Sequence, residues 1–215
     1  AMGKKVIHLN IGQPDIATPE VALLELKADT RTFIEYSPSE GYASYRDGLS
    51  SYYKRAGIDV NADEIVVTTG GSEALVFGFI SCMDPGDEVI IPEPFYANYR
   101  GFAQMAGVKI VPVTATIEDG FELPPISDFE KLITPRTKAI LICNPGNPTG
   151  KVYAPEAMNN LAQIIRDNDL YLFSDEVYRE FCYDGAVAKS VLQLDGIENN
   201  VVLIDSVSKR YSMCG

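Results

Sequence analysis

Three polar motifs in this chain follow short apolar runs, and their side chains are of types that could do chemistry together. Residues 144–150 read NPGNPTG, residues 174–178 read SDEVY, and residues 206–209 read SVSK. These motifs offer the amide of Asn147, the carboxylate of Asp175, the phenol of Tyr178 and the amine of Lys209. Such a set combines hydrogen-bond donors and acceptors with a carboxylate and a potential nucleophile.

Asp175 comes directly after the apolar run 170–173, so a buried strand would place this carboxylate at its end. A buried carboxylate needs a partner, and a protonated pyridine nitrogen would serve because opposite charges favour the ionised forms. A pyridine ring kept protonated in this way is an electron sink. A helix cap or an ion pair with a basic side chain is the alternative interpretation.

Lys209 follows the apolar run 201–205 and is flanked by Ser206 and Ser208. An unprotonated lysine amine can form a Schiff base with an aldehyde, and burial beside other cationic groups lowers the lysine pKa enough for that. The alternative interpretation is an ordinary solvated surface lysine. The lysine alone does not distinguish between these two interpretations, but the motifs around it do.

A glycine pair followed by serine, residues 70–72, joins an apolar run to a helix-like segment. Glycine lets the backbone approach a phosphate, and the first turn of a helix supplies unpaired N–H groups. Ser72 could instead be a simple helix cap. The segment lacks the third glycine of a dinucleotide fingerprint, which argues against a nicotinamide-dependent enzyme.

These motifs need a frame that brings them together, and the rest of the sequence predicts one. Apolar runs rich in valine and isoleucine predict strands at 64–69, 88–92, 108–113, 138–143, 170–174 and 201–205. Helix-like segments occupy 42–56, 72–83, 96–106, 127–133 and 155–168. Alternation of this kind predicts an α/β fold, a mostly parallel sheet with helices on both faces. Ligands bind beyond the carboxyl ends of such strands, where all the motifs lie.

The composition excludes several classes of partner. The chain has 215 residues, with 18 basic and 30 acidic side chains and a formal charge of -12, so we expect no binding to nucleic acid or to an anionic membrane. Its four cysteines show no CxxC spacing and there is one histidine, which predicts neither a metal site nor a disulfide framework. No apolar run reaches the length of a membrane span. A cytoplasmic location is therefore expected.

In residue type, order and spacing these motifs resemble the pyridoxal-phosphate (PLP) site of the class I and II aminotransferases, the fold-type I family. The resemblance spans residues 6–215. It implies a three-layer α/β/α large domain, PLP as cofactor, and transfer of an amino group between an amino acid and a 2-oxo acid. It also implies a homodimer. The catalytic residues would be Lys209 as general base and acid, Asp175 on the ring nitrogen, and Tyr178 on the ring hydroxyl oxygen.

The resemblance implies further contacts from other parts of the chain. Tyr96 would stack on the pyridine ring, where several aspartate aminotransferases have tryptophan. Tyr36 would reach the phosphate of the neighbouring subunit. The full implied cofactor-binding set is Lys209, Asp175, Tyr178, Asn147, Gly71, Ser72, Tyr96, Ser206 and Tyr36, and the implied substrate-binding set is Gly12, Tyr96 and Asn147.

Family members continue past the glycine equivalent to Gly215 to an arginine that binds the phosphate and to a small domain whose arginine grips the substrate carboxylate. Neither arginine lies in this chain. We therefore expect residues 1–35 to be an N-terminal segment at the substrate edge and residues 36–215 to be the PLP-binding large domain, with the C-terminal small domain absent. On this interpretation the chain is a fragment that is inactive alone.

Aspartate or another amino acid as donor, with 2-oxoglutarate as acceptor, is the first expectation for the substrates. Two alternatives stay open. A carbon-sulfur β-lyase of the same fold type would share the same cofactor residues, and turnover with a 2-oxo acid would separate it. A non-catalytic PLP-binding sensor domain of a transcription regulator would need a DNA-binding segment upstream, and the charge of -12 argues against it.

Overall fold

The computed structural model describes residues 12–214. Within this range a sheet of parallel strands has the order β2-β1-β3-β4-β5. The strands are β1 (Glu88–Glu93), β2 (Lys109–Thr114), β3 (Thr137–Cys143), β4 (Tyr171–Asp175) and β5 (Val201–Ile204). Because neighbouring strands run in the same direction, their carboxyl ends lie along one edge of the sheet.

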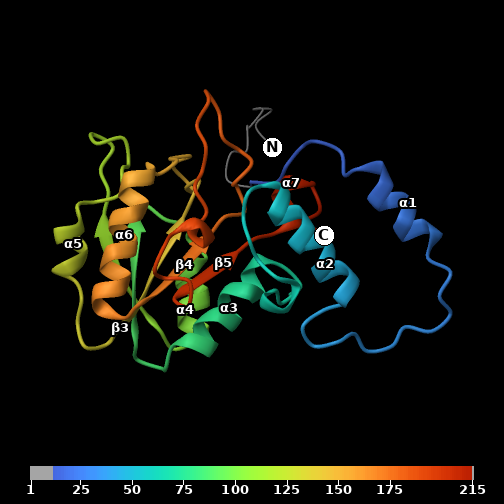
Figure 1. Cartoon of the computed structure of the whole chain (residues 1–215), viewed down its shortest axis with the longest axis horizontal. Helices are drawn as coiled ribbons and strands as arrows, with labels where there is room; N and C mark the ends of the chain where they lie inside the picture. Colours follow the sequence, from blue (N-terminus) through green and yellow to red (C-terminus); the bar gives the residue numbers. More distant parts are fainter. Residues whose placement is uncertain (1–11, 215) are drawn as a thin grey trace, which may run out of the picture.

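Helices cover both faces of this sheet (Figure 1). Helices α5 and α6 pack on one face, and α3 and α4 pack on the other. The predicted α/β fold, a parallel sheet with helices on both faces, is confirmed. The helices are α1 (Glu20–Ala28), α2 (Ala43–Arg55), α3 (Gly71–Cys82), α4 (Tyr99–Met105), α5 (Ile126–Glu130), α6 (Pro155–Asn168) and α7 (Val207–Arg210), with 3-10 turns η1 (Ala62–Glu64) and η2 (Val191–Gln193).

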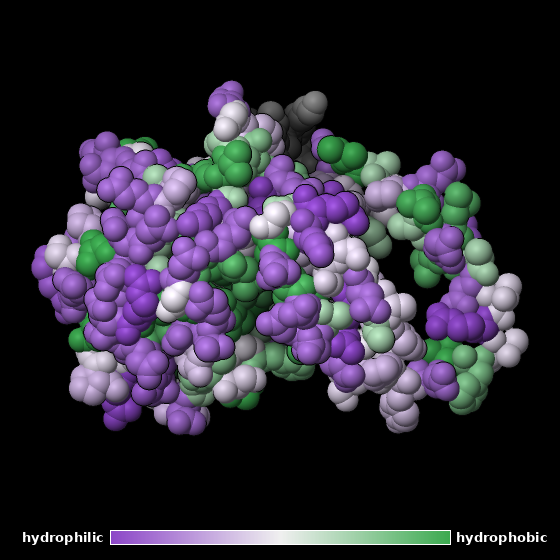
Figure 2. All heavy atoms as spheres, in the orientation of Figure 1, coloured by the Kyte–Doolittle hydropathy of each residue, from purple (hydrophilic) through white to green (hydrophobic). Residues whose placement is uncertain are grey.

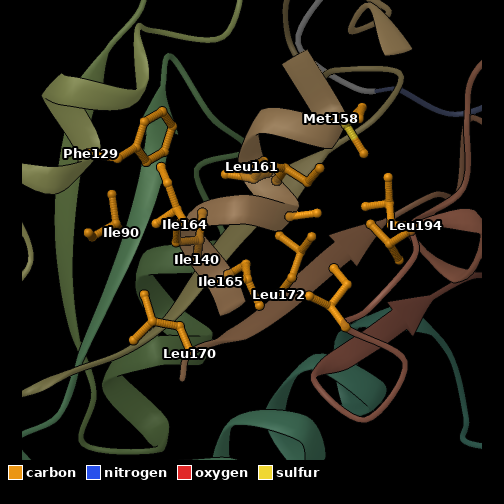
Figure 3. Close-up of a cluster of buried hydrophobic side chains, with 14 of the residues drawn as sticks. Ile90, Phe129, Ile140, Met158, Leu161, Ile164, Ile165, Leu170, Leu172 and Leu194 are labelled. Carbon is orange, nitrogen blue, oxygen red and sulfur yellow. The ribbon is translucent and has the colours of Figure 1, made fainter. Parts of the chain in front are cut away.

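Alternate residues of the central strands enter two separate cores, as expected for a sheet covered on both sides. Ile140 of β3 and Leu172 of β4 belong to the core beneath α6, which Figure 3 shows in close-up. Leu141 and Phe173, one residue further along, belong to the core beneath α3 and α4. All four side chains are fully buried. This burial fixes the register of the strands that carry the polar motifs.

Helix α6 forms over the range that its sequence predicts. Pro155 occupies the first turn, where its missing N–H costs nothing, and the apolar side chains face the sheet at helical spacing. The helix ends before Asp169, which has a left-handed backbone with φ of 49°. The chain then turns directly into β4, which brings Asp175 to the edge of the sheet.

One predicted strand is wrong. Residues 64–69 contain no strand, and η1 and an extended loop occupy this range. The Val67 N–H donates to the carbonyl of Glu40 at 3.0 Å rather than to a neighbouring strand, and Val66 is largely exposed. The apolar run therefore packs beside the chain that leads into α2 instead of joining the sheet.

Helix α3 packs closely on β4 through Gly78. A Cβ atom at this position would lie 2.6 Å from the ring of Phe173, two residues before Asp175. We expect Gly78→Ala to lower the free energy of unfolding by about 1–3 kcal/mol, because the added methyl group overpacks the core. Urea denaturation measures this change.

Gly48 provides a matched control within α2. A Cβ atom there would meet nothing within 4 Å. Gly48→Ala should therefore raise the free energy of unfolding by roughly 0.5–1 kcal/mol through the better helix propensity of alanine. Equal effects at the two glycines would show that the close contact with Phe173 does not exist.

Much of the chain between residue 12 and α2, including α1, projects from the body of the molecule (Figure 1), which it meets through Gly12, Thr18 and Glu40. No side chain of α1 is buried, and Figure 2 shows apolar surface on this projecting part. Its exposed apolar side chains include Ile16, Val21, Leu23, Leu24, Leu26, Phe33 and Ile34. The predicted boundary after residue 35, between an N-terminal segment and the large domain, stays a prediction. Among the described residues, no helix combines the length and apolar character needed to cross a bilayer.

Candidate active site

The sheet brings the three polar motifs to one edge. Cys143 at the end of β3 pairs with Asp175 at the end of β4, and Asp175 pairs with Ile204 at the end of β5. Three neighbouring parallel strands therefore stop level with one another. The chain continues from these strand ends as residues 144–150, 176–178 and 205–209. The three predicted motifs lie in these segments, except for Ser174 and Asp175, which are the last residues of β4.

Asp175 is buried at this edge, with 7% of its surface exposed. The hydroxyl of Tyr99 donates to its Oδ2 at 2.7 Å, and the N–H of Val177 donates to its Oδ1 at 3.3 Å. Burial raises the pKa of Asp175 to about 6, although these two hydrogen bonds oppose the rise. No basic side chain of the described residues forms an ion pair with it. Asp175 is thus an acceptor that a cationic ring nitrogen would suit.

Tyr99 was not singled out by the sequence, which pointed to Tyr96. The structure buries Tyr99 completely at the start of α4, 76 residues away from its partner Asp175. Tyr96 is half-buried in the turn before α4, and its ring meets that of Tyr99 edge-on with centroids 5.4 Å apart. The hydroxyl of Tyr96 accepts a hydrogen bond from Asn98 at 2.7 Å. The spacing of the two tyrosines at the start of a helix was the only signal for Tyr99.

We expect Tyr99→Phe to destabilise the protein only where Asp175 is ionised. Above about pH 6 the carboxylate carries its charge and loses a charge-assisted donor, which costs about 1.5–3 kcal/mol. At pH 4 the carboxyl is largely protonated in the folded protein, so the loss should be smaller. The same substitution should raise the pKa of Asp175 further. Urea denaturation at pH 8 and pH 4 measures the difference.

Tyr153→Phe is the control for this prediction. Tyr153 is another buried tyrosine, and its hydroxyl makes no hydrogen bond to any residue in the described range. Its substitution should change stability equally at the two pH values. If Tyr99→Phe behaved in the same way, Tyr99 would not be holding the charge of Asp175.

Asn147 and Tyr178 also lie together. Burial raises the pKa of the half-buried Tyr178, and the charges of Cys143 and Asp175 add to the rise, while a hydrogen bond with the Asn147 side chain opposes it. An amide and a phenol from adjacent strand ends can both contact one ligand oxygen. The structure therefore brings together the two residues that sequence motifs predicted for such an oxygen.

The start of α3 lies against the end of β5. A Cβ atom on Gly71 would be 3.6 Å from Ile204 and 3.9 Å from the carbonyl of Asp205, whereas one on Gly70 would meet nothing. No side chain caps α3, so its first N–H groups are available to an anion. Ser206 follows Asp205 and accepts a hydrogen bond from the N–H of Ser208 at 3.1 Å. The predicted phosphate contacts from the start of α3 and from Ser206 thus share one edge.

Lys209 lies in the short helix α7 and is half-buried. Its amine donates to the backbone carbonyl of Gly12 at 2.8 Å, across 197 residues of sequence. Two predicted site residues from opposite ends of the chain therefore touch. Tyr36 is placed differently, since its side chain is fully exposed between α1 and α2. Its predicted role at a neighbouring subunit stays a prediction.

Comparisons with known proteins agree with this arrangement. A model of the family "Aminotransferase class I and II" matches residues 4–215. An aspartate aminotransferase from Bacillus subtilis is 35% identical, over 100% of this chain and 55% of that protein. Aromatic-amino-acid aminotransferase 2 from Thermococcus litoralis is 33% identical, over 98% of this chain and 54% of its own length.

A solved structure is similar over the same range. The aspartate aminotransferase from Thermotoga maritima has a TM-score of 0.91 and 33% sequence identity, and the match covers 98% of this chain and 56% of that one. The chain thus spans about half the length of the relatives that it matches. The similarity includes the whole sheet and every motif at its carboxyl edge.

Proposed function

The chain belongs to the class I and II aminotransferases, and from this membership we propose that it is the PLP-binding part of an enzyme that transfers amino groups. The substrates would be an amino acid and a 2-oxo acid. The observation that carries the proposal is the buried carboxylate of Asp175, held by Tyr99 at the same sheet edge as Lys209. Such a carboxylate suits a protonated ring nitrogen, because opposite charges stabilise each other's ionised forms.

The residues present fit PLP in the chemistry of their donors and acceptors. Asp175 would accept from the ring nitrogen, and Asn147 and Tyr178 would contact the ring hydroxyl oxygen. The first turn of α3, with Gly71 and Ser72, supplies N–H groups for the phosphate. Ser206 would also bind the phosphate, Tyr96 would lie against the face of the ring, and Lys209 would react with the aldehyde.

When bound, PLP supplies an aldehyde that condenses with an amine, with loss of water, and a ring that accepts electrons from the substrate α-carbon. The chain's own groups do the rest. Asp175 would keep the ring nitrogen protonated, and the amine of Lys209 would take the proton from the substrate α-carbon as general base and give it up again as general acid. Gly12, whose carbonyl holds the Lys209 amine, would lie against the substrate.

For the substrates we propose aspartate or another amino acid as donor and 2-oxoglutarate as acceptor. Support comes from the names of the relatives, which include aspartate and aromatic-amino-acid aminotransferases. The aspartate and the aromatic donors differ in their side chains and share the α-amino group that is transferred and the α-carboxylate beside it. Rates with aspartate and with an aromatic amino acid, measured with the same acceptor, distinguish between them.

We also propose that the active unit is a homodimer, with a second copy of the chain covering the projecting segment around α1. The exposed apolar side chains of this segment support that proposal, because monomers seldom leave such a stretch in water. Light scattering after size exclusion measures the mass, and a monomer at micromolar concentration would contradict it. A cytoplasmic location stays a prediction, in keeping with the free thiols Cys82, Cys143, Cys182 and Cys214.

Borohydride reduction after addition of PLP tests the cofactor site directly. Reduction fixes the cofactor on the lysine that holds it, and peptide mass mapping then identifies that lysine. We expect the label on Lys209 alone, in the protein at its natural length. A folded protein that takes no label, or takes it on surface lysines only, would contradict the proposed function.

A further inference from the structure

A cluster of charged side chains lies beside Lys209 and has no part in the function proposed above. It consists of Asp205 at the end of β5, Arg210 at the end of α7 and Arg179 in the segment after β4. The exposed fractions of these side chains are 10%, 6% and 7%. Buried charges are costly unless they are paired, so three of them next to a candidate lysine call for an explanation.

Asp205 is the centre of the cluster. Its Oδ2 accepts hydrogen bonds from both guanidinium groups at 3.2 Å, and its Oδ1 accepts from Arg210 at 3.1 Å. The hydroxyl of Tyr53 donates to Oδ2 at 2.9 Å. The backbone N–H of Ser206 donates to Oδ1 at 2.7 Å. Asp205 is therefore held by Arg210 through both carboxylate oxygens and is fixed to the residue that begins α7.

The cluster also connects to α2 and to the segment after β4. The guanidinium of Arg210 lies over the ring of Tyr52 with its carbon 5.0 Å from the centroid, and its Nε lies 3.1 Å from Glu180 Oε1. Arg179 donates to the hydroxyl of Tyr52 at 2.9 Å and to Glu176 at 3.1 Å. Glu176 follows Asp175 directly, so the cluster joins the two strand ends that carry Asp175 and Lys209.

Helix α7 needs such support because it is only four residues long. One helical turn is unstable by itself, since several residues are ordered for a single hydrogen bond. Asp205 lies directly before residues 206–209 and Arg210 directly after them. The ion pair between these two side chains therefore links the two ends of the turn. The direction in which Lys209 points is therefore set by the residue directly after it.

The two arginines of the cluster stay charged over the ordinary pH range. Burial is the largest influence on the pKa of Arg210 and lowers it, but the charge of Asp205, the hydrogen bonds to Asp205 and the nearby Tyr52 and Glu180 together outweigh burial, so the net shift is upward. Arg179 behaves in the same way. The acidic groups that face the two arginines are Asp205, Glu176 and Glu180. The positive charges of the cluster are thus permanent.

We propose that Arg210 is a positioning residue, which fixes the Lys209 amine for attachment to the cofactor aldehyde. It would do so through its ion pair with Asp205 and its packing on Tyr52. This inference rests on the proposed function. In this role Arg210 would act through Lys209 and would not itself contact cofactor or substrate. Lysine in its place would keep the charge but lose the two-pronged contact with Asp205, because only guanidinium presents paired donors in one plane.

The test compares three variants in the protein at its natural length after removal of PLP. In Arg210→Met and Arg210→Lys, the rate at which added PLP becomes attached to Lys209 should fall roughly 10- to 100-fold, the scale of effect that misplaced reactive groups have. Absorbance follows the attachment and borohydride trapping identifies its site. Arg166→Met is the matched control, because Arg166 lies on α6, away from the cluster. Its guanidinium donates to the carbonyl of Asp195 and to the side chain of Gln163. It should attach PLP at the wild-type rate.

A fourth variant separates positioning from general stability. Arg210→Met leaves Asp205 buried with one guanidinium fewer, so its stability should fall as well. The double variant Asp205→Asn/Arg210→Gln removes both charges, and an amide oxygen can still accept from the N–H of Ser206. We expect its melting temperature to recover while its attachment rate stays low.

Each outcome decides between the two proposals. Attachment at the wild-type rate in the Arg210 variants, or attachment that recovers together with the melting temperature in the double variant, would overturn the positioning role alone. A wild-type protein without label at Lys209 would overturn the proposed function and this inference with it. Slow attachment despite recovered stability would support both.

Discussion

A Lys209→Ala variant is expected to lose amino-group transfer by on the order of 10⁴-fold or more, because one residue serves as both cofactor attachment point and proton carrier. The variant should still bind PLP without a covalent bond, since the phosphate and ring contacts do not involve Lys209. Transfer is measured with aspartate and 2-oxoglutarate, and bound cofactor is measured by absorbance after dialysis. Borohydride should fix no cofactor on the protein.

Two further variants sharpen this prediction. Lys209→Arg keeps the positive charge but offers no free amine, because arginine stays protonated, and it should be as inactive as the alanine variant. Lys189→Ala is the control, since Lys189 is also half-buried and its amine makes one hydrogen bond, to Asn159 at 3.0 Å. A small amine added to Lys209→Ala should restore part of the proton transfer. Transfer within tenfold of the wild-type rate in Lys209→Ala would contradict the assigned role.

Much of the fold could be predicted because each element carries a strong local signal. Helix α6 has proline in its first turn and apolar residues at helical spacing, and the structure has it over Pro155–Asn168 as predicted. The runs that became β1, β3 and β4 are buried on both faces, so periodicity and composition agreed. The run at 64–69 had a similar composition but formed no strand. A strand needs a neighbouring strand to pair with, and the position of this run in the fold provides none.

The site was predictable only where sequence motifs mark it. Asn147, Asp175 and Lys209 lie at or within a few residues of strand ends, so a parallel sheet had to bring them to one edge. Tyr99 and Arg210 were missed because their roles depend on distant partners. Tyr99 meets Asp175 across 76 residues, and Arg210 packs on Tyr52 from α2, for which no local pattern exists. Nor does any local pattern mark α7, whose single turn is held by an ion pair.

Asp175→Asn is expected to weaken the enzyme and at the same time to stabilise the protein without cofactor. Burial raises the pKa of Asp175 to about 6 from its ordinary value of 3.8, so the folded protein holds a proton that the unfolded chain releases. Stability should therefore fall as the pH rises between these values, and above about pH 6 the full cost of the buried charge is present. Asparagine removes that cost.

The gain should be about 1–2 kcal/mol at pH 8, less than the full pKa shift implies, because an amide has one acceptor oxygen where the carboxylate has two. At pH 4 the gain should vanish, since the carboxyl is then largely protonated in the folded wild type. Thermal unfolding of the cofactor-free proteins at both pH values measures this. Tyr99 keeps its hydrogen bond in the variant, because the amide oxygen can accept it.

Addition of PLP should reverse the order of stability. In the wild type the cationic ring nitrogen would lower the pKa of Asp175 and turn a costly charge into an ion pair, whereas asparagine cannot keep the ring protonated. Transfer in Asp175→Asn should fall roughly 10²- to 10³-fold, the loss typical of a removed electrostatic contact. Equal stabilisation of both proteins by PLP would show that Asp175 does not meet the ring nitrogen. A variant less stable than the wild type at pH 8 without cofactor would contradict the raised pKa.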